Sequence, residues 1–217
     1  MTSLVDGVIV EHKPYDFTNI FVSQFAMKYT NDWTTALEAN LKGLVHYIKT
    51  SNLQHGNVLE IGCYEGKGTR LINTFFKPSV QVCCDPWDSA YEDVGFHFKN
   101  QYEHFKHNTN DLSIIEMRMT SDEFFKGQDC LMFDFVYIDG DHSYEQVVKD
   151  LNNSLSILKL GGLCIVDDYS WDPASTNPVR KAVNEFALYN AKKIRRLNID
   201  DDTQFAFTKL SDLSYTD

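Results

Sequence analysis

Apolar segments of strand length alternate with helical patterns along this chain, and that alternation constrains its fold more than any other feature. Helical spacing of apolar residues follows the first, second and fourth of these segments. Parallel strands need such crossovers, because each connection must carry the chain back to the starting edge of the sheet. The sequence therefore predicts an α/β fold whose mainly parallel sheet has helices on both faces. The predicted strands are residues 56–62, 80–85, 112–119, 133–139 and 162–168.

The last third of the chain carries further boundary signals. Gly161 and Gly162 are predicted to end the preceding helix and to start the fifth strand, because glycine readily adopts the left-handed backbone of a helix end. Asn177 and Pro178 favour the cap and the first position of a helix that runs to about Asn190. The segments "KIRRLNI" and "QFAFTKL" then flank "DDDT". This arrangement predicts a closing antiparallel hairpin.

No linker, repeat or low-complexity stretch interrupts the 217 residues, which predicts a single domain. Within it, residues 1–50 are expected to form an N-terminal helical lid or cap, and residues 51–217 the main domain. Aromatic residues recur at every fourth position from 17 to 33, which on a helix gives one stripe. The stripe would pack on the domain or on a second subunit, or act as a lid whose Tyr29 or Trp33 borders a substrate.

Charge and composition narrow the partners. A formal net charge of -11 leaves no general basic field, which disfavours nucleic acid and anionic membrane surfaces. The five cysteines show no C-x-x-C spacing, which is typical of reduced thiols rather than of a disulfide framework or a zinc site. No apolar run approaches the roughly 20 residues of a membrane span. We therefore expect a soluble, cytoplasmic protein without nucleic-acid or membrane partners.

Acidic and hydroxyl side chains stand at the ends of the predicted strands. In an open parallel sheet, ligands bind in the crevice beyond the carboxyl ends of the strands, so these residues are the candidates for function. Read in chain order, the strand ends carry Glu60, Asp85, Thr120 with Ser121, Asp139, and Asp167 with Asp168.

The turn after the first strand, "EIGCYEGKGT", is rich in glycine but has the order G-x-x-x-G-x-G rather than the dinucleotide order G-x-G-x-x-G. Glu60 and Glu65 flank this turn and favour a cationic or zwitterionic ligand over a pyrophosphate. Asp85 ends the second strand, where a carboxylate can accept hydrogen bonds from both hydroxyls of a ribose. The alternative is that the glycines only make a strand-to-helix turn and that Asp85 only caps a helix.

A second cluster follows the fourth and fifth strands. Asp139 and Asp167 are 28 residues apart, which suits adjacent parallel strands, so Asp139, Asp167 and Asp168 are expected to crowd together. A hard divalent cation such as Mg²⁺ would relieve the repulsion and prefers oxygen ligands. His142, beside Asp141 and three residues after Asp139, is a candidate base. Alternatively, "DGDH" is only a turn and the later pair only a cap.

These motifs resemble class I S-adenosylmethionine-dependent methyltransferases, whose first motif is E/D-x-G-x-x-x-G. The resemblance covers about residues 55–210 and implies a Rossmann-like, seven-stranded sheet with a C-terminal antiparallel hairpin. It makes residues 51–217 the S-adenosylmethionine-binding domain. Gly62 and Tyr64 would approach the methionine half of the cofactor, and Ser121 would lie near adenine. Asp85 would accept hydrogen bonds from the ribose hydroxyls. The full set implied for the cofactor is Glu60, Gly62, Tyr64, Gly66, Gly68, Asp85, Ser121 and Asp139.

The acid after the fourth strand and the acidic pair after the fifth are similar to the metal-dependent O-methyltransferases. The wording "IDGDHSYE" resembles the sugar O-methyltransferases that tailor macrolide and aminocoumarin antibiotics. This resemblance implies Mg²⁺ or Mn²⁺ on Asp139, Asp167 and Asp168, with Asp141 or His142 as the base. It also implies methyl transfer to a hydroxyl of a sugar or glycan, against which Trp33 and Trp171 could stack.

Three alternatives stay open at this point. The acceptor could be a small phenol or catechol, which also offers two adjacent oxygens. A nicotinamide-dependent oxidoreductase uses a similar sheet, although the glycine order disfavours it. A catalytically inactive cofactor-binding scaffold is the third. The expected partner is a small-molecule or glycan acceptor, and a homo-oligomer is possible for any of these functions.

Overall fold

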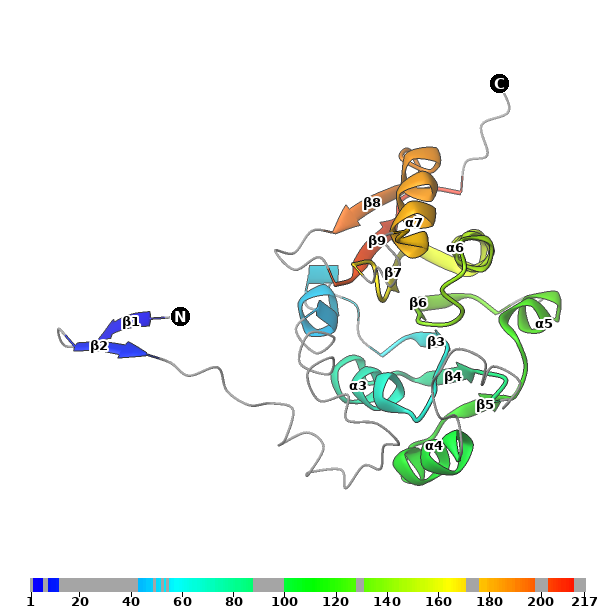
Figure 1. The fold of residues 1–217 in the computed structure, drawn as a ribbon, viewed down its shortest axis with the longest axis horizontal. Coiled ribbons are helices and arrows are strands. Elements are labelled where there is room, and N and C mark those ends of the chain that lie inside the picture. Colours follow the sequence, from blue (N-terminus) through cyan, green and yellow to red (C-terminus); the bar gives the residue numbers. More distant parts are fainter. Residues whose placement is uncertain are drawn as a thin grey trace.

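The computed structural model shows two sheets, a two-stranded one near the N-terminus and a seven-stranded one that forms the body of the domain (Figure 1). The small sheet pairs β1 (Thr2–Val5) with β2 (Val8–Glu11) in antiparallel register. The structure describes residues 2–5, 8–11, 43–48, 50–51, 53, 55–87, 100–127, 131–170, 176–197 and 203–212.

The large sheet has the strand order β5-β4-β3-β6-β7-β9-β8. Its first five strands in that order are parallel, whereas β9 is antiparallel to both β7 and β8. The predicted α/β fold, with a mainly parallel seven-stranded sheet and a C-terminal antiparallel hairpin, is therefore confirmed. The strands are β3 (Asn57–Ile61), β4 (Val80–Cys84), β5 (Ile115–Met117), β6 (Phe133–Ile138), β7 (Leu158–Val166), β8 (Ile194–Leu197) and β9 (Phe205–Lys209).

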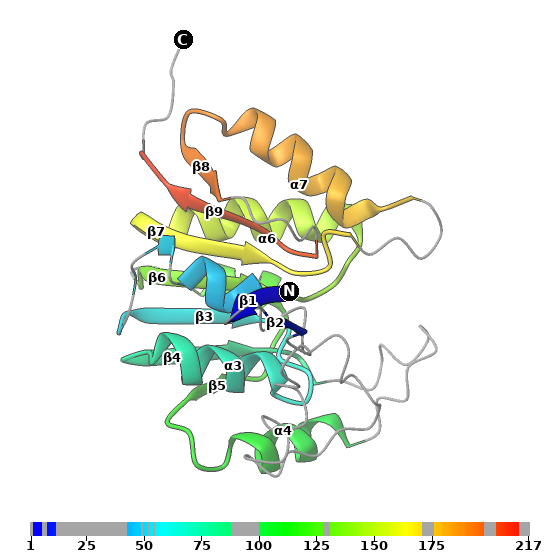
Figure 2. The same cartoon turned by 90° about the vertical axis from the view of Figure 1, so that its left-hand side faces the viewer.

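Helices cover both faces of this sheet (Figures 1 and 2). Successive side chains of a strand point to opposite faces, so β6 divides its residues between two cores. Phe135 and Tyr137 pack in the core that α3 closes, whereas Val136 and Ile138 pack in the core closed by α6 and α7. None of the described helices is long and apolar enough to cross a membrane. The helices are α3 (Lys67–Phe76), α4 (Gln101–Thr109), α5 (Ser121–Lys126), α6 (Tyr144–Ile157) and α7 (Pro178–Tyr189).

The junction between α6 and β7 differs from the predicted glycine cap. The helix ends at Ile157, and the strand begins at once with Leu158, a fully buried residue that pairs with Phe133 of β6. The chain then bulges before Leu163 resumes the pairing with Phe135, and Gly161 has the left-handed φ of 76° inside this bulge. The prediction that the glycines cap the helix was wrong, because the buried pairing of Leu158 starts the strand earlier.

The other predicted boundaries near the C-terminus are confirmed. Asn177 is the cap of α7, where its side-chain oxygen accepts a hydrogen bond from the backbone N–H of Arg180 at 2.8 Å, and Pro178 occupies the first helical position. The described cysteines are buried free thiols, as expected for reduced side chains: Cys63, Cys83, Cys84 and Cys164.

The first fifty residues were predicted to form a helical lid, and the hairpin of β1 and β2 was not part of that prediction. Residues 43–48 are helical, and Leu44, Tyr47 and Ile48 are buried in the same core as α3. The aromatic stripe, with Tyr29 and Trp33, lies outside the described residues. The division of the chain at residue 50 stays a prediction.

Replacing Phe135 with alanine should lower the free energy of unfolding by about 3–5 kcal/mol, because a fully buried ring would leave a cavity in the core. Its ring packs at 5.4 Å from that of Phe76, between centroids. Urea unfolding would measure the loss. Leu188→Ala, at a side chain that is 80% exposed, is the matched control and should change stability by less than about 0.5 kcal/mol. Equal losses in the two variants would contradict the placement of β6 at the centre of the sheet.

Candidate functional site

The ends of β3 and β6 meet at Gly62. Its φ of 81° is left-handed, and a Cβ atom at this position would overlap the carbonyl oxygen of Asp139. The Asp139 N–H donates to the Ile61 carbonyl at 2.8 Å, and the Gly62 N–H donates to the Cys84 carbonyl at 2.9 Å. Glycine at position 62 is thus required by close contact between two backbones. This contact brings the strand ends that carry the predicted site residues to one edge.

Asp85, the predicted ribose acceptor, holds the glycine-rich turn against the end of β4. Its Oδ2 accepts hydrogen bonds from the N–H groups of Cys63 at 2.8 Å and Tyr64 at 2.9 Å. Its Oδ1 accepts one from Trp87 at 2.6 Å. Burial raises the pKa of Asp85, while these backbone donors oppose the shift. Because Oδ1 accepts a single bond from the part of the chain that the structure describes, it keeps acceptor capacity for a ligand.

Glu60 is buried beneath the same turn, with 1% of its surface exposed. Its Oε2 accepts a hydrogen bond from the hydroxyl of Thr69 at 2.6 Å, whereas Oε1 has no hydrogen-bond partner among the described residues. Burial raises the pKa of Glu60 to about 8, and the charges of Asp139 and Asp85 add to the shift. A buried acceptor without a donor is costly, so a ligand that donates a hydrogen bond here would relieve that cost.

Ser121 is the first residue of α5, after a capping box formed by Thr120 and Glu123. Its hydroxyl oxygen accepts a hydrogen bond from the side-chain amide of Gln146 at 3.1 Å. The same amide contacts Asp150, and burial raises the pKa of Asp150 to about 6. Gln146 and Asp150 were not among the site residues predicted from the sequence. Their spacing of four residues on a predicted helix was the available signal, since it places both on one face.

Asp139, Asp168 and His142 form one cluster beyond the ends of β6 and β7. Nε2 of His142 lies 3.3 Å from Oδ2 of Asp168 and 3.7 Å from Oδ1 of Asp139. One ligand atom from each residue lies within 4.8 Å of the others, so the three could hold a metal ion together. All three side chains remain partly exposed, which leaves them open to a ligand.

The electrostatics of this cluster follow from its crowded acids. Burial, together with the charge of Asp167, raises the pKa of Asp139 to about 7. Burial alone would lower the pKa of His142, but the two carboxylates that face it outweigh burial and raise it. An added cation would therefore bind a site where negative charge is already concentrated.

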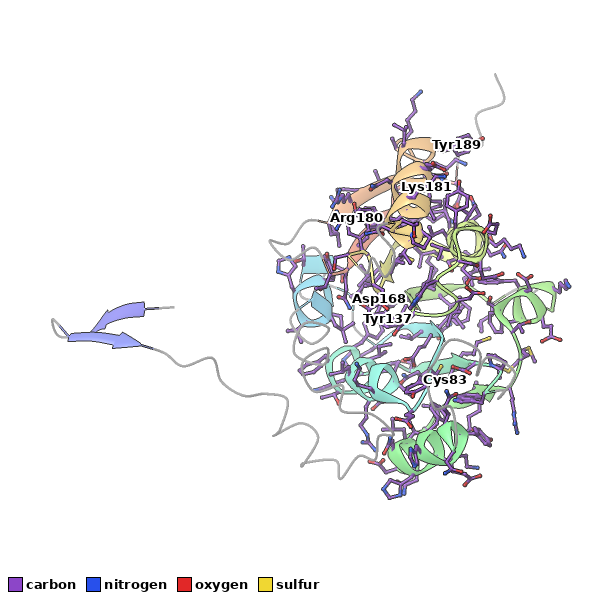
Figure 3. All side chains as sticks on the ribbon, viewed as in Figure 1. Cys83, Tyr137, Asp168, Arg180, Lys181 and Tyr189 are labelled. Carbon is purple, nitrogen blue, oxygen red and sulfur yellow. The ribbon has the colours of Figure 1, made fainter. Side chains whose placement is uncertain are left out.

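Asp167, the third predicted metal ligand, forms hydrogen bonds with groups other than the side chains of this cluster. Its Oδ2 accepts a hydrogen bond from the hydroxyl of Tyr137 at 2.6 Å, and its Oδ1 accepts from the Gln204 amide at 3.3 Å and from the backbone N–H of Asp168 at 3.0 Å. Asp168 has the left-handed φ of 54°, which turns the two consecutive side chains apart. Figure 3 labels Tyr137 and Asp168, which appear next to each other in that view.

Asp141, the other candidate base, is exposed and lies outside the cluster. Its Oδ1 accepts a hydrogen bond from the Ser143 N–H at 2.7 Å in the turn before α6. This contact is the turn role that the sequence analysis held open for "DGDH". The structure thus brings His142, but not Asp141, to Asp139 and Asp168. Trp171, one of the predicted acceptor walls, lies outside the described residues.

Comparison with known proteins gives a family match over the residues just described. A model of a methyltransferase domain family matches residues 59–169, just over half of the chain. The uncharacterised protein R132 of Acanthamoeba polyphaga mimivirus is 31% identical over 130 residues. That match covers 58% of this chain and 58% of R132, so the chain spans less than two thirds of the length of this curated relative.

Solved structures share the fold over most of the chain. The O-methyltransferase TomG of Streptomyces achromogenes, involved in tomaymycin synthesis and solved with S-adenosylmethionine, has a TM-score of 0.59 at 14% identity, over 90% of this chain and 96% of TomG. An O-methyltransferase of Bacillus cereus, solved with S-adenosylhomocysteine, has a TM-score of 0.56 at 17% identity, over 90% of this chain and 92% of that one. At these identities the likeness shows a common fold.

The raised pKa of Asp150 predicts how stability depends on pH. A carboxyl whose pKa is about 6 when folded, against about 3.9 when unfolded, binds its proton more tightly in the native state, so its contribution to stability is lost as pH rises toward 6. Asp150→Asn removes this titration. The melting temperature of the variant, relative to that of the wild type, should therefore rise between pH 4 and pH 7.

The control for this prediction is Asp111→Asn, since the hydrogen bond from Arg70 lowers the pKa of Asp111. Asp111 is ionised in both states above pH 5, so its variant should show a constant difference from the wild type between pH 5 and pH 7. A difference for Asp150→Asn that is equally constant from pH 4 to pH 7 would show that Asp150 is not a buried, titrating acid.

Proposed function

The chain belongs to a methyltransferase domain family, and from this premise we propose that it is an O-methyltransferase. The methyl donor in this proposal is S-adenosylmethionine, and the acceptor is a hydroxyl of a sugar or glycan, with Mg²⁺ or Mn²⁺ assisting. The observation that carries the proposal is the cluster of Asp139, His142 and Asp168 at the carboxyl edge of the sheet. This cluster stands beside the glycine-rich turn that Asp85 holds in place.

The turn suits S-adenosylmethionine, which carries a sulfonium, a charged amino group and a ribose with two hydroxyls. Oε1 of Glu60 is a buried acceptor to which none of the described residues donates, and an ammonium group would supply that donor. Oδ1 of Asp85 keeps capacity to accept from a ribose hydroxyl. Ser121 is the first residue of α5, which follows β5, the strand that pairs with β4, and it is the residue proposed to lie near adenine. The solved complexes of TomG and of the Bacillus cereus enzyme, which hold S-adenosylmethionine and its demethylated product, support this cofactor.

The acid cluster suits a hard divalent cation, because it offers two carboxylates and one imidazole at mutual distances that one ion can span. In this proposal Asp139 and Asp168 hold the ion, and Asp167 orients Asp168 by accepting a hydrogen bond from its backbone N–H. A bound Mg²⁺ would lower the pKa of an acceptor hydroxyl in contact with it. This assignment keeps two of the three ligands expected from the sequence and gives the third a positioning role.

His142 is the proposed base. Its Nε2 lies between the two carboxylates, whose charge raises its pKa and favours uptake of a proton at this nitrogen. The proton leaves the acceptor hydroxyl as its oxygen bonds to the methyl carbon, and the carbon–sulfur bond of the donor breaks. Asp141 is the weaker candidate, since the Ser143 N–H already holds its carboxylate.

Among acceptors, the proposal favours a sugar over a phenol or catechol. Both offer two adjacent oxygens to a cation, and the resemblance of "IDGDHSYE" to sugar-modifying enzymes decides the order. The family match argues against the nicotinamide oxidoreductase. An inactive cofactor-binding scaffold is the remaining rival, and only an assay separates it from an enzyme. Assembly as a homo-oligomer stays a prediction.

The test is methyl transfer from labelled S-adenosylmethionine to panels of sugars, glycans and phenols, with and without EDTA. Transfer to at least one sugar, lost in EDTA and restored by Mg²⁺ or Mn²⁺, is the expected result. Asp168→Asn should lower turnover at least about 100-fold, because it removes a charged ligand, and should leave binding of S-adenosylhomocysteine within about twofold.

Asp141→Asn is the matched control, since it changes an acid in the neighbouring turn that lies outside the cluster. It should keep turnover within a few-fold of the wild type. Full activity of Asp168→Asn in chelator would contradict the metal role. Transfer to catechols but to no sugar would reverse the order of acceptors, and tight binding of the cofactor without transfer to any acceptor would favour the scaffold.

A further inference from the structure

Two arginines gather over one aromatic ring beside the acid cluster. Tyr169, the residue after Asp168, is buried, and the guanidinium carbon of Arg180 lies 4.7 Å from the centre of its ring. That of Arg196 lies 5.8 Å from the same centre and 5.0 Å from the ring of Phe205. The Nε–H of Arg180 also donates to the Tyr169 carbonyl at 3.2 Å, which fixes this side chain near the end of β7.

The two arginines come from different elements that meet at one edge of the sheet, where α7 begins and β8 ends. Arg180 lies in the first turn of α7, and Arg196 is the penultimate residue of β8. Leu197 of β8 pairs with the same β9 residue, Ala206, as Ile165 of β7, so the ends of these two strands are level. The labels of Figure 3 place Arg180 and Asp168 in the same region of the molecule. The arginines therefore stand next to the proposed site of methyl transfer.

Several other described cations near the sheet are neutralised by carboxylates. Arg70, Lys149, Lys159 and Lys209 each pair with an aspartate. Within the described part of the chain, neither Arg180 nor Arg196 takes part in an ion pair. Two like charges over one ring repel each other, and a bound anion would offset that repulsion.

We propose that Arg180 and Arg196 form an anion-binding subsite for the acceptor, so that the methylated molecule is a hydroxylated compound with a carboxylate or phosphate group. This proposal rests on the proposed function, because it takes the bound molecule to be the acceptor of the methyl group. Binding of the anion itself does not depend on methyl transfer. The planar N–H groups of a guanidinium match both kinds of oxyanion. Tyr169 holds the two guanidinium groups by cation–π contact and leaves their outer N–H groups for the ligand.

Calorimetric titration of the full chain saturated with S-adenosylhomocysteine tests the subsite. The probes are glucuronate, glucose 6-phosphate and glucose, which share a sugar ring and differ in charge. Wild-type protein should bind at least one of the two anions 10-fold or more tightly than glucose. Stronger binding of glucuronate would assign a carboxylate ligand, and stronger binding of glucose 6-phosphate a phosphate ligand.

The variants are Arg180→Gln, Arg196→Gln and the double variant, each checked for an unchanged melting temperature. Each single change should weaken binding of the preferred anion about 10-fold and leave glucose unaffected, because one charged hydrogen-bond partner is lost. Arg195→Gln is the matched control. This exposed neighbour on β8 points to the opposite face of the strand, so its variant should bind like the wild type.

Several results would overturn the subsite: equal affinity for all three probes, an unchanged affinity in the double variant, or an equal loss in Arg195→Gln, which would indicate a general effect of surface charge.

Kinetics separate this proposal from the proposed function. If transfer occurs and the double variant raises KM for an anionic sugar without changing kcat, the subsite and the proposed function are both supported. If the anion binds but nothing is methylated, the subsite stands and the function fails. Transfer to neutral sugars alone, unaffected in the double variant, would leave the function and remove the subsite.

Discussion

The contact between the backbones of Gly62 and Asp139 is the constraint on which the rest of the site depends. In the parallel register, Ile61 pairs with Ile138 and Ile138 pairs with Val166, so three strands end at one level. The Asp167 N–H continues this ladder by donating to the Ile138 carbonyl at 2.9 Å. A side chain at position 62 would force these ends apart. Because the ends are level, the side chains that follow them converge without any long loop to position them.

This convergence has an electrostatic cost. Burial raises the pKa of Glu60 to about 8 and that of Asp139 to about 7, so both carboxyls are held where their charged forms are disfavoured. A chain selected for stability alone would not collect acids in this way, and perturbed acids of this kind cluster at functional sites. A cationic cofactor group and a divalent ion are the ligands that would lower this cost, which links the local electrostatics to the proposed reaction.

Strand patterns in the sequence predicted the large sheet, its closing hairpin and the residues that stand at the strand ends. They did so because burial on both faces of a parallel sheet leaves a strong apolar signal. The direction of single side chains was beyond such patterns. Asp167 and Asp168 are adjacent in sequence, yet the left-handed backbone of Asp168 sends one carboxylate to Tyr137 and the other to His142. The stacking of Arg180 and Arg196 on Tyr169 was equally hidden, since it joins a helix, a strand and a loop distant in sequence.

The proposed reaction requires that Asp139 and Asp168 hold a divalent cation beside the cofactor. Crystals grown with S-adenosylhomocysteine and Mn²⁺, measured at the manganese absorption edge, would show whether they do. We expect an anomalous peak within about 2.0–2.4 Å of oxygens from both carboxylates, with the oxygens of Asp167 still bound to Tyr137 and Gln204. A cofactor bound in the glycine-rich turn with no manganese peak between Asp139 and Asp168 would contradict it.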